Sequence, residues 1–215
     1  MHTTLAARLV LTIALLFSSV PSHPATAAED PRITEEERTS LLDYLDRSQR
    51  EFEALLQDVS DAQWNWTPAP ERWSIAEVAR HIVISEDYLF EQSMLAMRNP
   101  ADPEWMAKTG GKTALLERAL PDRTRKVQAP EPLNPLGGPA MTRAEVLAAF
   151  RQKRAKTREF AMTTQLPLRE HLTKGLFPIF DPLNAYQFVL YIPLHNLRHN
   201  LQLAEVKRSP GYPPR

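Results

Sequence analysis

Residues 181–207 read DPLNAYQFVLYIPLHNLRHNLQLAEVK, and the order of apolar and imidazole side chains in this stretch decides the fold. One set of side chains recurs at steps of four, three, four and three residues: Phe188, Ile192, His195, His199 and Gln202. These steps place all of them on one face of an α-helix, because one helical turn spans between three and four residues. The sequence therefore predicts a helix, continuing to about Lys207, that turns this face toward the protein interior.

Both ends of this helix carry recognisable signals. Asp181 is suited to the N-cap, and Pro182 suits the first helical position, where its missing N–H costs nothing. The Ser-Pro-Gly sequence at residues 209–211 would end the helix. Pro193 lies inside the pattern, shortly before His195, and predicts a kink because proline removes one backbone hydrogen bond.

Three further segments begin with a capping box, in which a serine or threonine and a glutamate three residues later satisfy each other's backbone N–H. The pairs are Thr34 with Glu37, Ser74 with Glu77, and Thr142 with Glu145. Each pair precedes an apolar stripe of helical period, which predicts helices over residues 34–59, 74–97 and 142–164. No segment shows the alternation of a strand. Four long helices predict an all-α fold, specifically a four-helix bundle.

A long crossover separates the second and third of these helices. Residues 100–140 are rich in proline and glycine, and only residues 113–120 favour a short helix. A connection of this length within a compact domain is typical of a lid, a binding loop or a disordered crossover. A second irregular stretch, residues 166–180, precedes the last helix.

The composition excludes several classes of protein. The chain has 215 residues, a size typical of one domain, and its 26 basic and 26 acidic residues give a formal charge of +0. Without a basic surplus or stripe, the sequence argues against a nucleic-acid partner. It contains no cysteine, which excludes disulfides, thiolate metal sites, cysteine nucleophiles and a lipoprotein anchor. Any metal ligands must therefore be histidine, aspartate or glutamate.

The N-terminus has the layout of a secretory signal peptide. Arg8 precedes the apolar run 9–17, and the Ala-Thr-Ala sequence at residues 25–27 fits a cleavage site. The run is too short for a full membrane span, although an uncleaved anchor stays the alternative. We expect a signal peptide over residues 1–27, a flexible 28–33, the domain over 34–207 and a tail over 208–215. The mature chain would lie in a bacterial periplasm or be secreted, without stable membrane insertion.

Three histidines fall on helix faces that point inward. His195 and His199 stand four residues apart, close enough to bind one ion, and His81 lies on the inward stripe of residues 74–97 between Val78 and Ser85. Burying three unpaired imidazoles leaves polar atoms unsatisfied, whereas a divalent cation accepts a lone pair from each ring. Three protein ligands leave one coordination position open, which is typical of catalytic rather than structural sites.

Simpler interpretations compete with this one. A histidine on an apolar face is more often a hydrogen-bonded core residue, and a pair at i and i+4 is a weak signal alone. Glu77 is a weak candidate for a proton acceptor, but it also completes a capping box. Gln202 fits an outer hydrogen-bond donor or a polar helix end. Arg198 would bind an anionic substrate or lie exposed on the helix.

At these residues the chain also resembles a known family. Trp64 and residues 73–81 (WSIAEVARH) resemble the N-terminal half of the DinB-like superfamily, and residues 181–188 (DPLNAYQF) with 195–202 (HNLRHNLQ) resemble its C-terminal half. The resemblance covers residues 34–207 apart from the crossover. It implies an up-down-down-up four-helix bundle with a three-histidine metal site, whose ligands correspond to His81, His195 and His199. Members include thiol-dependent transferases and isomerases, but the export signal and the proline-rich insert depart from the cytoplasmic members.

These observations lead to three functional hypotheses. The first is a metal-dependent hydrolase or transferase of a small-molecule substrate. The second is a non-catalytic metal- or ligand-binding bundle, and the third is a bundle that has lost its metal and acts through its surface. Imidazole suits zinc, nickel, copper and iron, so we expect one divalent ion, with zinc, nickel or iron as the main candidates and no organic cofactor. A homodimer is compatible with all three hypotheses.

Overall fold

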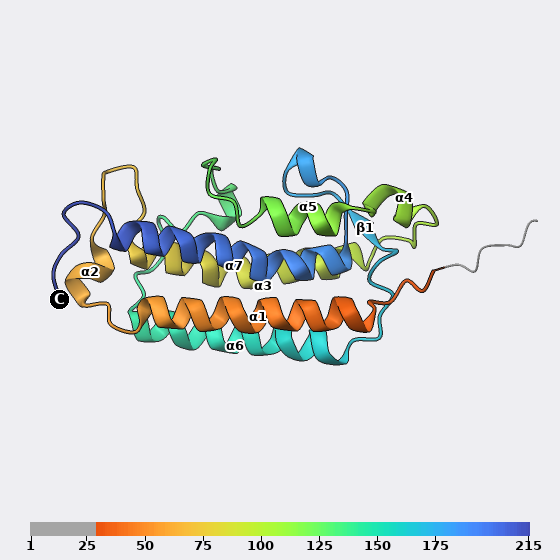
Figure 1. Cartoon of the computed structure of the whole chain (residues 1–215), viewed down its shortest axis with the longest axis horizontal. Helices are drawn as coiled ribbons and strands as arrows, with labels where there is room; N and C mark the ends of the chain where they lie inside the picture. The colour runs from red at the N-terminus through yellow and green to blue at the C-terminus, as the bar shows by residue number, and fades with distance from the viewer. Residues whose placement is uncertain (1–28) are drawn as a thin grey trace, which may run out of the picture.

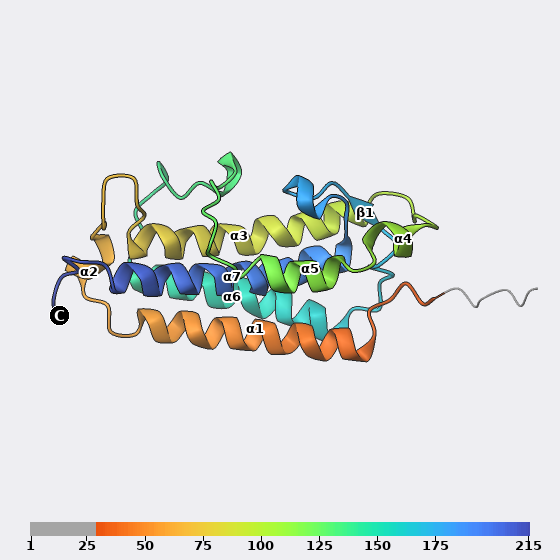
Figure 2. The same cartoon turned by 45° about the horizontal axis from the view of Figure 1, so that its top comes forward.

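The computed structural model describes residues 29–215, so the predicted signal peptide lies outside the described part of the chain. The structure is mostly helical, as predicted. Its four long helices are α1 (Glu35–Leu56), α3 (Ile75–Ala96), α6 (Arg143–Thr163) and α7 (Ala185–Lys207). α7 packs against α1 and α3, and α6 packs against the same two helices. Figures 1 and 2 show the four lying side by side, with α1 and α7 running opposite to α3 and α6.

Three of the four long helices start where the sequence predicts. All three expected capping boxes are present: at Thr34 and Glu37, at Ser74 and Glu77, and at Thr142 and Glu145. Each box provides hydrogen-bond acceptors for two backbone N–H groups that have no partner within the helix. Apolar faces of the four helices then bury one another, with Leu45, Phe52, Leu89, Phe150 and Phe188 at 0% exposure. Capping therefore sets the helix starts, and the apolar stripes set their orientation.

The predicted start of the last helix was wrong. Asn184, not Asp181, is the N-cap of α7: it accepts from Gln187 N at 2.8 Å, and Asn184 N donates to Gln187 Oε1 at 3.1 Å. Leu183 and Asn184 instead form strand β2 (Leu183–Asn184), which pairs antiparallel with β1 (Leu172–Thr173). This pair also corrects the prediction of no strand, because two residues are too few for alternation to show. Beyond it, α7 runs unbroken through Pro193 to Lys207.

The crossover is built from short helices. It contains α4 (Trp105–Thr109), α5 (Lys112–Ala119) and the 3₁₀-helix η1 (Glu131–Leu133), and α5 confirms the predicted short helix at residues 113–120. A short α2 (Asp61–Asn65) and η2 (Pro178–Phe180) complete the elements. α5 contacts α7, and η1 contacts α3. In Figures 1 and 2 the green crossover accordingly runs along the α3 and α7 side.

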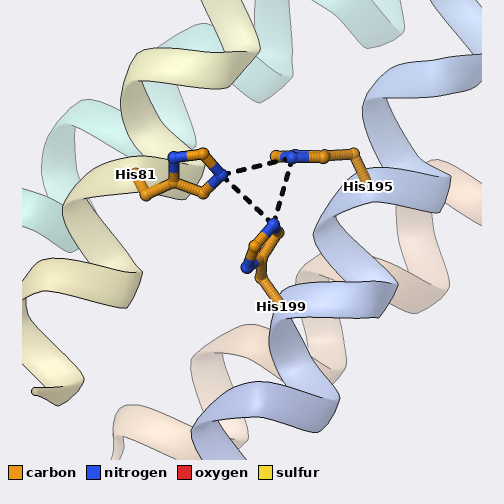
Figure 3. A group of neighbouring side chains, drawn as sticks. All are labelled: His81, His195 and His199. Atoms are coloured by element: carbon orange, nitrogen blue, oxygen red, sulfur yellow. Dashed lines mark hydrogen bonds between the residues drawn. The ribbon is translucent and has the colours of Figure 1, made fainter. Parts of the chain in front are cut away.

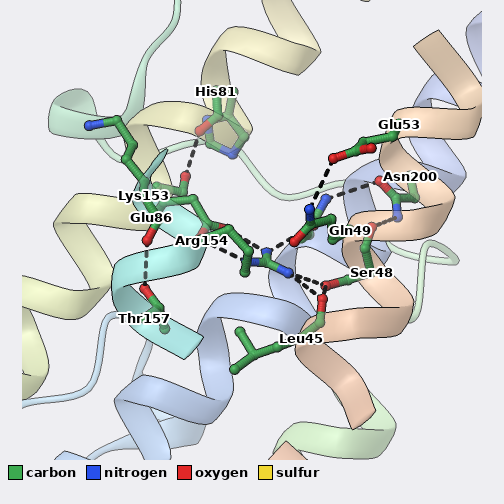
Figure 4. Close-up of polar contacts among 12 residues, drawn as sticks. Leu45, Ser48, Gln49, Glu53, His81, Glu86, Lys153, Arg154, Thr157 and Asn200 are labelled. Carbon is green, nitrogen blue, oxygen red and sulfur yellow. Dashed lines mark hydrogen bonds and ion pairs between the residues drawn. The ribbon is translucent and has the colours of Figure 1, made fainter. Parts of the chain in front are cut away.

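A buried polar network joins all four long helices. Arg154 of α6 forms a two-point ion pair with Glu86 of α3, at 3.0 Å and 2.5 Å, and both side chains are 1% exposed (Figure 4). The same guanidinium donates to Leu45 O at 2.7 Å and Ser48 Oγ at 2.6 Å on α1, and to Asn196 Oδ1 at 3.0 Å on α7. A planar guanidinium with fixed donor directions constrains the position of every helix that accepts from it.

No helix within residues 29–215 is both long enough and apolar enough to cross a membrane.

Candidate metal centre

The three predicted histidines meet between α3 and α7. Their Nε2 atoms form a nearly equilateral triangle: 3.2 Å from His81 to His195, 3.1 Å from His81 to His199, and 3.1 Å from His199 to His195 (Figure 3). Exposure of the residues is 2%, 8% and 6% for His81, His195 and His199. The helical pitch brings His195 and His199 together on α7, and the packing of α3 on α7 brings His81 to them.

The outer nitrogens fix the protonation of two rings. His81 Nδ1 lies 2.6 Å from the carbonyl oxygen of Leu133, which can only accept, so Nδ1 carries the proton. His199 Nδ1 lies 2.8 Å from Gln202 Oε1, and Arg123 Nη1 donates to the same atom at 3.3 Å. Since a guanidinium only donates, this atom is the amide oxygen, and His199 Nδ1 is also a donor. Both rings therefore direct bare Nε2 lone pairs at the same point.

This arrangement fits a divalent cation. Two lone pairs 3.1 Å apart in a buried site repel each other unless a proton or a cation lies between them. Metal–imidazole bonds of about 2.1 Å separate ligand nitrogens by roughly 3.4 Å in a tetrahedral site and roughly 3.0 Å on an octahedral face. The observed separations of 3.1–3.2 Å fall between these values. The three-histidine group could therefore hold a metal ion.

Burial also keeps the rings in the form that a metal requires. Desolvation lowers the pKa of His81 to about 4. Desolvation, helped by the neighbouring rings, likewise lowers the pKa values of His195 and His199 well below the ordinary value. All three imidazoles are therefore neutral at pH 7, with lone pairs available for coordination.

Two of the weaker candidate residues have structural partners. The Glu77 carboxylate accepts from Ser74 N at 2.7 Å and from Ser74 Oγ at 3.0 Å, so it caps α3 and does not join the three-histidine group. Arg198 is buried at 8% exposure, which rules out an exposed helix-face role. Its guanidinium donates to the carbonyl oxygens of Leu120, Asp122 and Arg125, and thereby ties the crossover to α7.

Gln202 and Leu133 hold the rings from outside. The structure places Gln202 against His199 as a hydrogen-bond acceptor, the opposite polarity from the donor role predicted for it. Sequence reasoning missed Leu133, 52 residues from its partner, because the contact uses a backbone carbonyl that no side-chain pattern marks. Such outer partners fix the orientation and tautomer of ligand rings.

A cavity of about 750 Å³ opens onto the histidines. Its walls are α7 at Tyr191, Arg198 and Gln202, the crossover from Ala119 to Leu133, and the segment from Leu176 to Phe180. Burial raises the pKa of Tyr191, so its hydroxyl stays protonated as a donor. The crossover that the sequence described as a lid, a binding loop or a disordered connection is thus a wall of this cavity.

Fold and site together define a mostly helical protein with a buried three-histidine group that could hold a metal ion and faces a ligand-sized cavity. A model of the DinB superfamily matches residues 44–203, about three quarters of the chain, and the chain belongs to that superfamily. The match includes all three histidines and spans the crossover, which the sequence motifs left out. Neither a curated protein nor a solved structure matches the chain.

Proposed function

We propose that the chain is an up-down-down-up four-helix bundle that binds one divalent metal ion through His81, His195 and His199 and acts as a metal-dependent hydrolase or transferase of a small molecule. The observation that carries this proposal is the convergence of three Nε2 atoms, which lie 3.1–3.2 Å from one another. In two of these rings the proton is on Nδ1, which points away from the triangle. Three ligands leave coordination positions open toward the cavity, the pattern of catalytic sites.

Each residue of the site has a definable task. When bound, the ion supplies Lewis acidity to an oxygen or sulfur of the ligand. Leu133 and Gln202 hold the His81 and His199 rings so that little reorganisation is needed on binding. Tyr191, whose ring centroid lies 6.0 Å from that of His195, offers a hydroxyl donor to a ligand in the cavity. Leu120 and Phe180, both buried, limit water access.

A second candidate is a non-catalytic metal- or ligand-binding protein on the same scaffold. One observation favours it: no carboxylate joins the three-histidine group in the described part of the chain, and Glu77 is occupied by its capping role. The acidic residues that line the cavity, Glu71 and Asp122, are both exposed. A catalyst of this kind would have to take its proton acceptor from the substrate or from water.

Elemental analysis tests the metal proposal. The chain would be purified without chelator and without a histidine tag, beside His81→Ala and His171→Ala. His171 lies outside the group and bonds Asn99 O, so its removal controls for the loss of any histidine. We expect about one metal ion per chain in the wild type and His171→Ala, and none in His81→Ala. The same trace of metal in all three would refute the site.

Activity assays then separate the two candidates. Turnover of an ester, amide or thiol-transfer substrate that disappears in His195→Ala supports the enzyme. Stoichiometric metal without turnover across such a panel supports the binding protein.

We also propose export of the chain to a periplasm or to the medium, on the strength of the signal-like residues 1–27. N-terminal sequencing of the mature protein tests cleavage of this segment. A chain that starts near Ala28 supports cleavage, whereas a chain that starts at Met1 or His2 contradicts it.

A further inference from the structure

We propose that the cavity takes a small amphipathic anion, with its charged group held by cations of the crossover and its apolar body on the apolar side chains that line the same cavity. This inference rests on the proposed function only in placing a metal ion at the base of the cavity. It goes further by naming the ligand class that the walls select.

The first observation is a local excess of positive charge. The cavity is lined by five cationic side chains, Arg72, Arg123, Arg125, Lys126 and Arg198, against two acidic ones, while the whole chain has a formal charge of +0. Arg123 is neutralised by Glu205 at 2.8 Å. Arg72, Arg125 and Lys126 form no ion pair within 4.0 Å among the described residues, although Arg72 lies near enough to Glu205, and Arg125 to Asp122, to lower the pKa of each carboxyl. A cavity with walls of one sign concentrates ligands of the other.

Arg198 fixes part of this charge in place. Its buried guanidinium is held by three backbone carbonyls, one of them Arg125 O at 2.7 Å, and no carboxylate lies within 4.0 Å of it in residues 29–215. A buried guanidinium adds positive potential to the adjacent cavity, and the Asp122 and Glu205 carboxylates offset it only from beyond ion-pair distance. By holding the Arg125 backbone, it also positions the Arg125 and Lys126 side chains. Arg198 is therefore a positioning residue for the anion site.

The second observation is an apolar wall with exposed large side chains. Trp73, Leu176, Phe177 and Phe180 line the cavity, together with Ile179 and Val127. Ile179 is 62% exposed and Val127 is 56% exposed, although they come from separate segments of the chain. Apolar side chains gathered at the mouth of one cavity mark a surface that a ligand covers. The cavity volume of about 750 Å³ suits a small organic molecule rather than a polymer.

Together the two walls require a ligand with two different ends. A small inorganic anion would leave the apolar wall without a contact, and a neutral apolar molecule would leave the cations without partners. One anionic group, such as a carboxylate, phosphate or sulfonate, joined to an apolar body satisfies both walls.

A matched pair of fluorescent probes tests this inference. 1-Anilinonaphthalene-8-sulfonate carries an anionic group on an apolar body, and N-phenyl-1-naphthylamine is the same body without the charge. We expect the double substitution Arg125→Gln/Lys126→Gln to weaken sulfonate binding about three- to tenfold and to leave the neutral probe unchanged, because only the charge interaction is lost. Ile179→Ser should weaken both probes by a similar factor. Arg50→Gln, an exposed cation of α1 outside the cavity, is the control and should change neither.

The outcomes separate this inference from the metal proposal when metal content is measured on the same preparations. If Arg125→Gln/Lys126→Gln keeps its metal but affects both probes equally, or neither, the ligand inference is wrong and the metal proposal stands. If Ile179→Ser leaves the binding of both probes unchanged, the apolar wall is not the binding surface and the inference is also wrong. If the wild type holds no metal while the charge variant still discriminates between the probes, the metal proposal fails and the ligand class survives.

Discussion

Gln202 orients one ring of the candidate metal site from outside the three-histidine group. Its Oε1 accepts from His199 Nδ1 at 2.8 Å and so keeps the Nε2 lone pair of that ring directed at the triangle. We predict that Gln202→Leu lowers metal affinity about 10- to 100-fold, the usual effect of losing an outer hydrogen-bond partner. Gln202→Glu keeps the acceptor and should retain wild-type affinity or exceed it. Competition with a chromophoric chelator measures both.

The control for this prediction is Gln49→Leu, the same change on α1, where the amide donates to Glu53 at 3.0 Å and lies outside the three-histidine group. It should leave metal affinity unchanged. If Gln202→Leu binds metal as tightly as Gln49→Leu does, then Gln202 does not orient the ring.

The buried rings also predict how the metal-free protein responds to pH. Because burial lowers the pKa of His81 from 6.5 to about 4, the unfolded chain binds more protons than the folded one between these values. The contribution of His81 to the free energy of unfolding therefore falls as the pH drops below about 6.5 and changes little above it. From about pH 7 to about pH 5, we expect His81 alone to account for a loss of about 2 kcal/mol. Denaturant unfolding of chelator-treated protein measures the loss.

His81→Leu provides the comparison. It removes one titrating ring, so its stability should decline less steeply over the same pH range. Equal slopes for the wild type and His81→Leu would mean that the ring does not titrate as its burial requires.

At this scale the sequence predicted the three histidines that approach each other and Gln202 as an outer partner, but not the backbone groups that hold the rings. His81, His195 and His199 were recognised because each lies on an apolar face of a helix, where a side-chain pattern is visible. The Leu133 carbonyl and the three carbonyls around Arg198 are backbone groups, and every residue has one. Their positions depend on the path of the crossover, which no local pattern specifies.

At the scale of the helix, the α3 capping box tests whether Glu77 is a proton acceptor or only a capping residue. Its carboxylate accepts from Ser74 N and Ser74 Oγ, so glutamine, which also caps helices, should replace it with little effect. We predict that Glu77→Gln keeps full metal content and any activity, and that Ser74→Ala lowers the free energy of unfolding by about 1 kcal/mol. Loss of activity in Glu77→Gln, with metal and stability intact, would instead make Glu77 a proton acceptor.

The same local chemistry explains where helix prediction succeeded and where it failed. Thr34, Ser74 and Thr142 each stand three residues before a glutamate, and each begins a helix as predicted. At the last helix the predicted start is Asp181-Pro182, whereas the structure uses a capping box of Asn184 with Gln187. The helix starts later because Leu183 and Asn184 are held extended by pairing with β1, a contact with residues on another segment.

At the scale of the whole molecule, the arrangement of the helices depends on groups that look ordinary in the sequence. Glu86 and Arg154 resemble the charged residues of solvated helix faces, yet both are buried where α1, α3, α6 and α7 meet (Figure 4). Asn196 and Asn200, each next to a site histidine on α7, extend this network to Ser48 of α1. The network therefore links the packing of the helices to the position of the site.

Removing one member of the buried ion pair should be more costly than removing both. Arg154→Met leaves the Glu86 carboxylate buried without its partner, and we predict a loss of about 3–5 kcal/mol in the free energy of unfolding. Arg154→Met/Glu86→Leu removes the unpaired carboxylate and should recover part of that loss, while Leu45 O, Ser48 and Asn196 still lose a donor. Arg158→Met, on the same helix, breaks a half-exposed pair with Asp46 and should cost less than about 1 kcal/mol.

Denaturant unfolding compares the wild type with these three variants. If Arg154→Met fails to fold, folding of the double variant still identifies the unpaired carboxylate as the cause. Equal losses for Arg154→Met and Arg158→Met, or a double variant no more stable than the single one, would show that the buried pair does not hold the helices as its geometry requires.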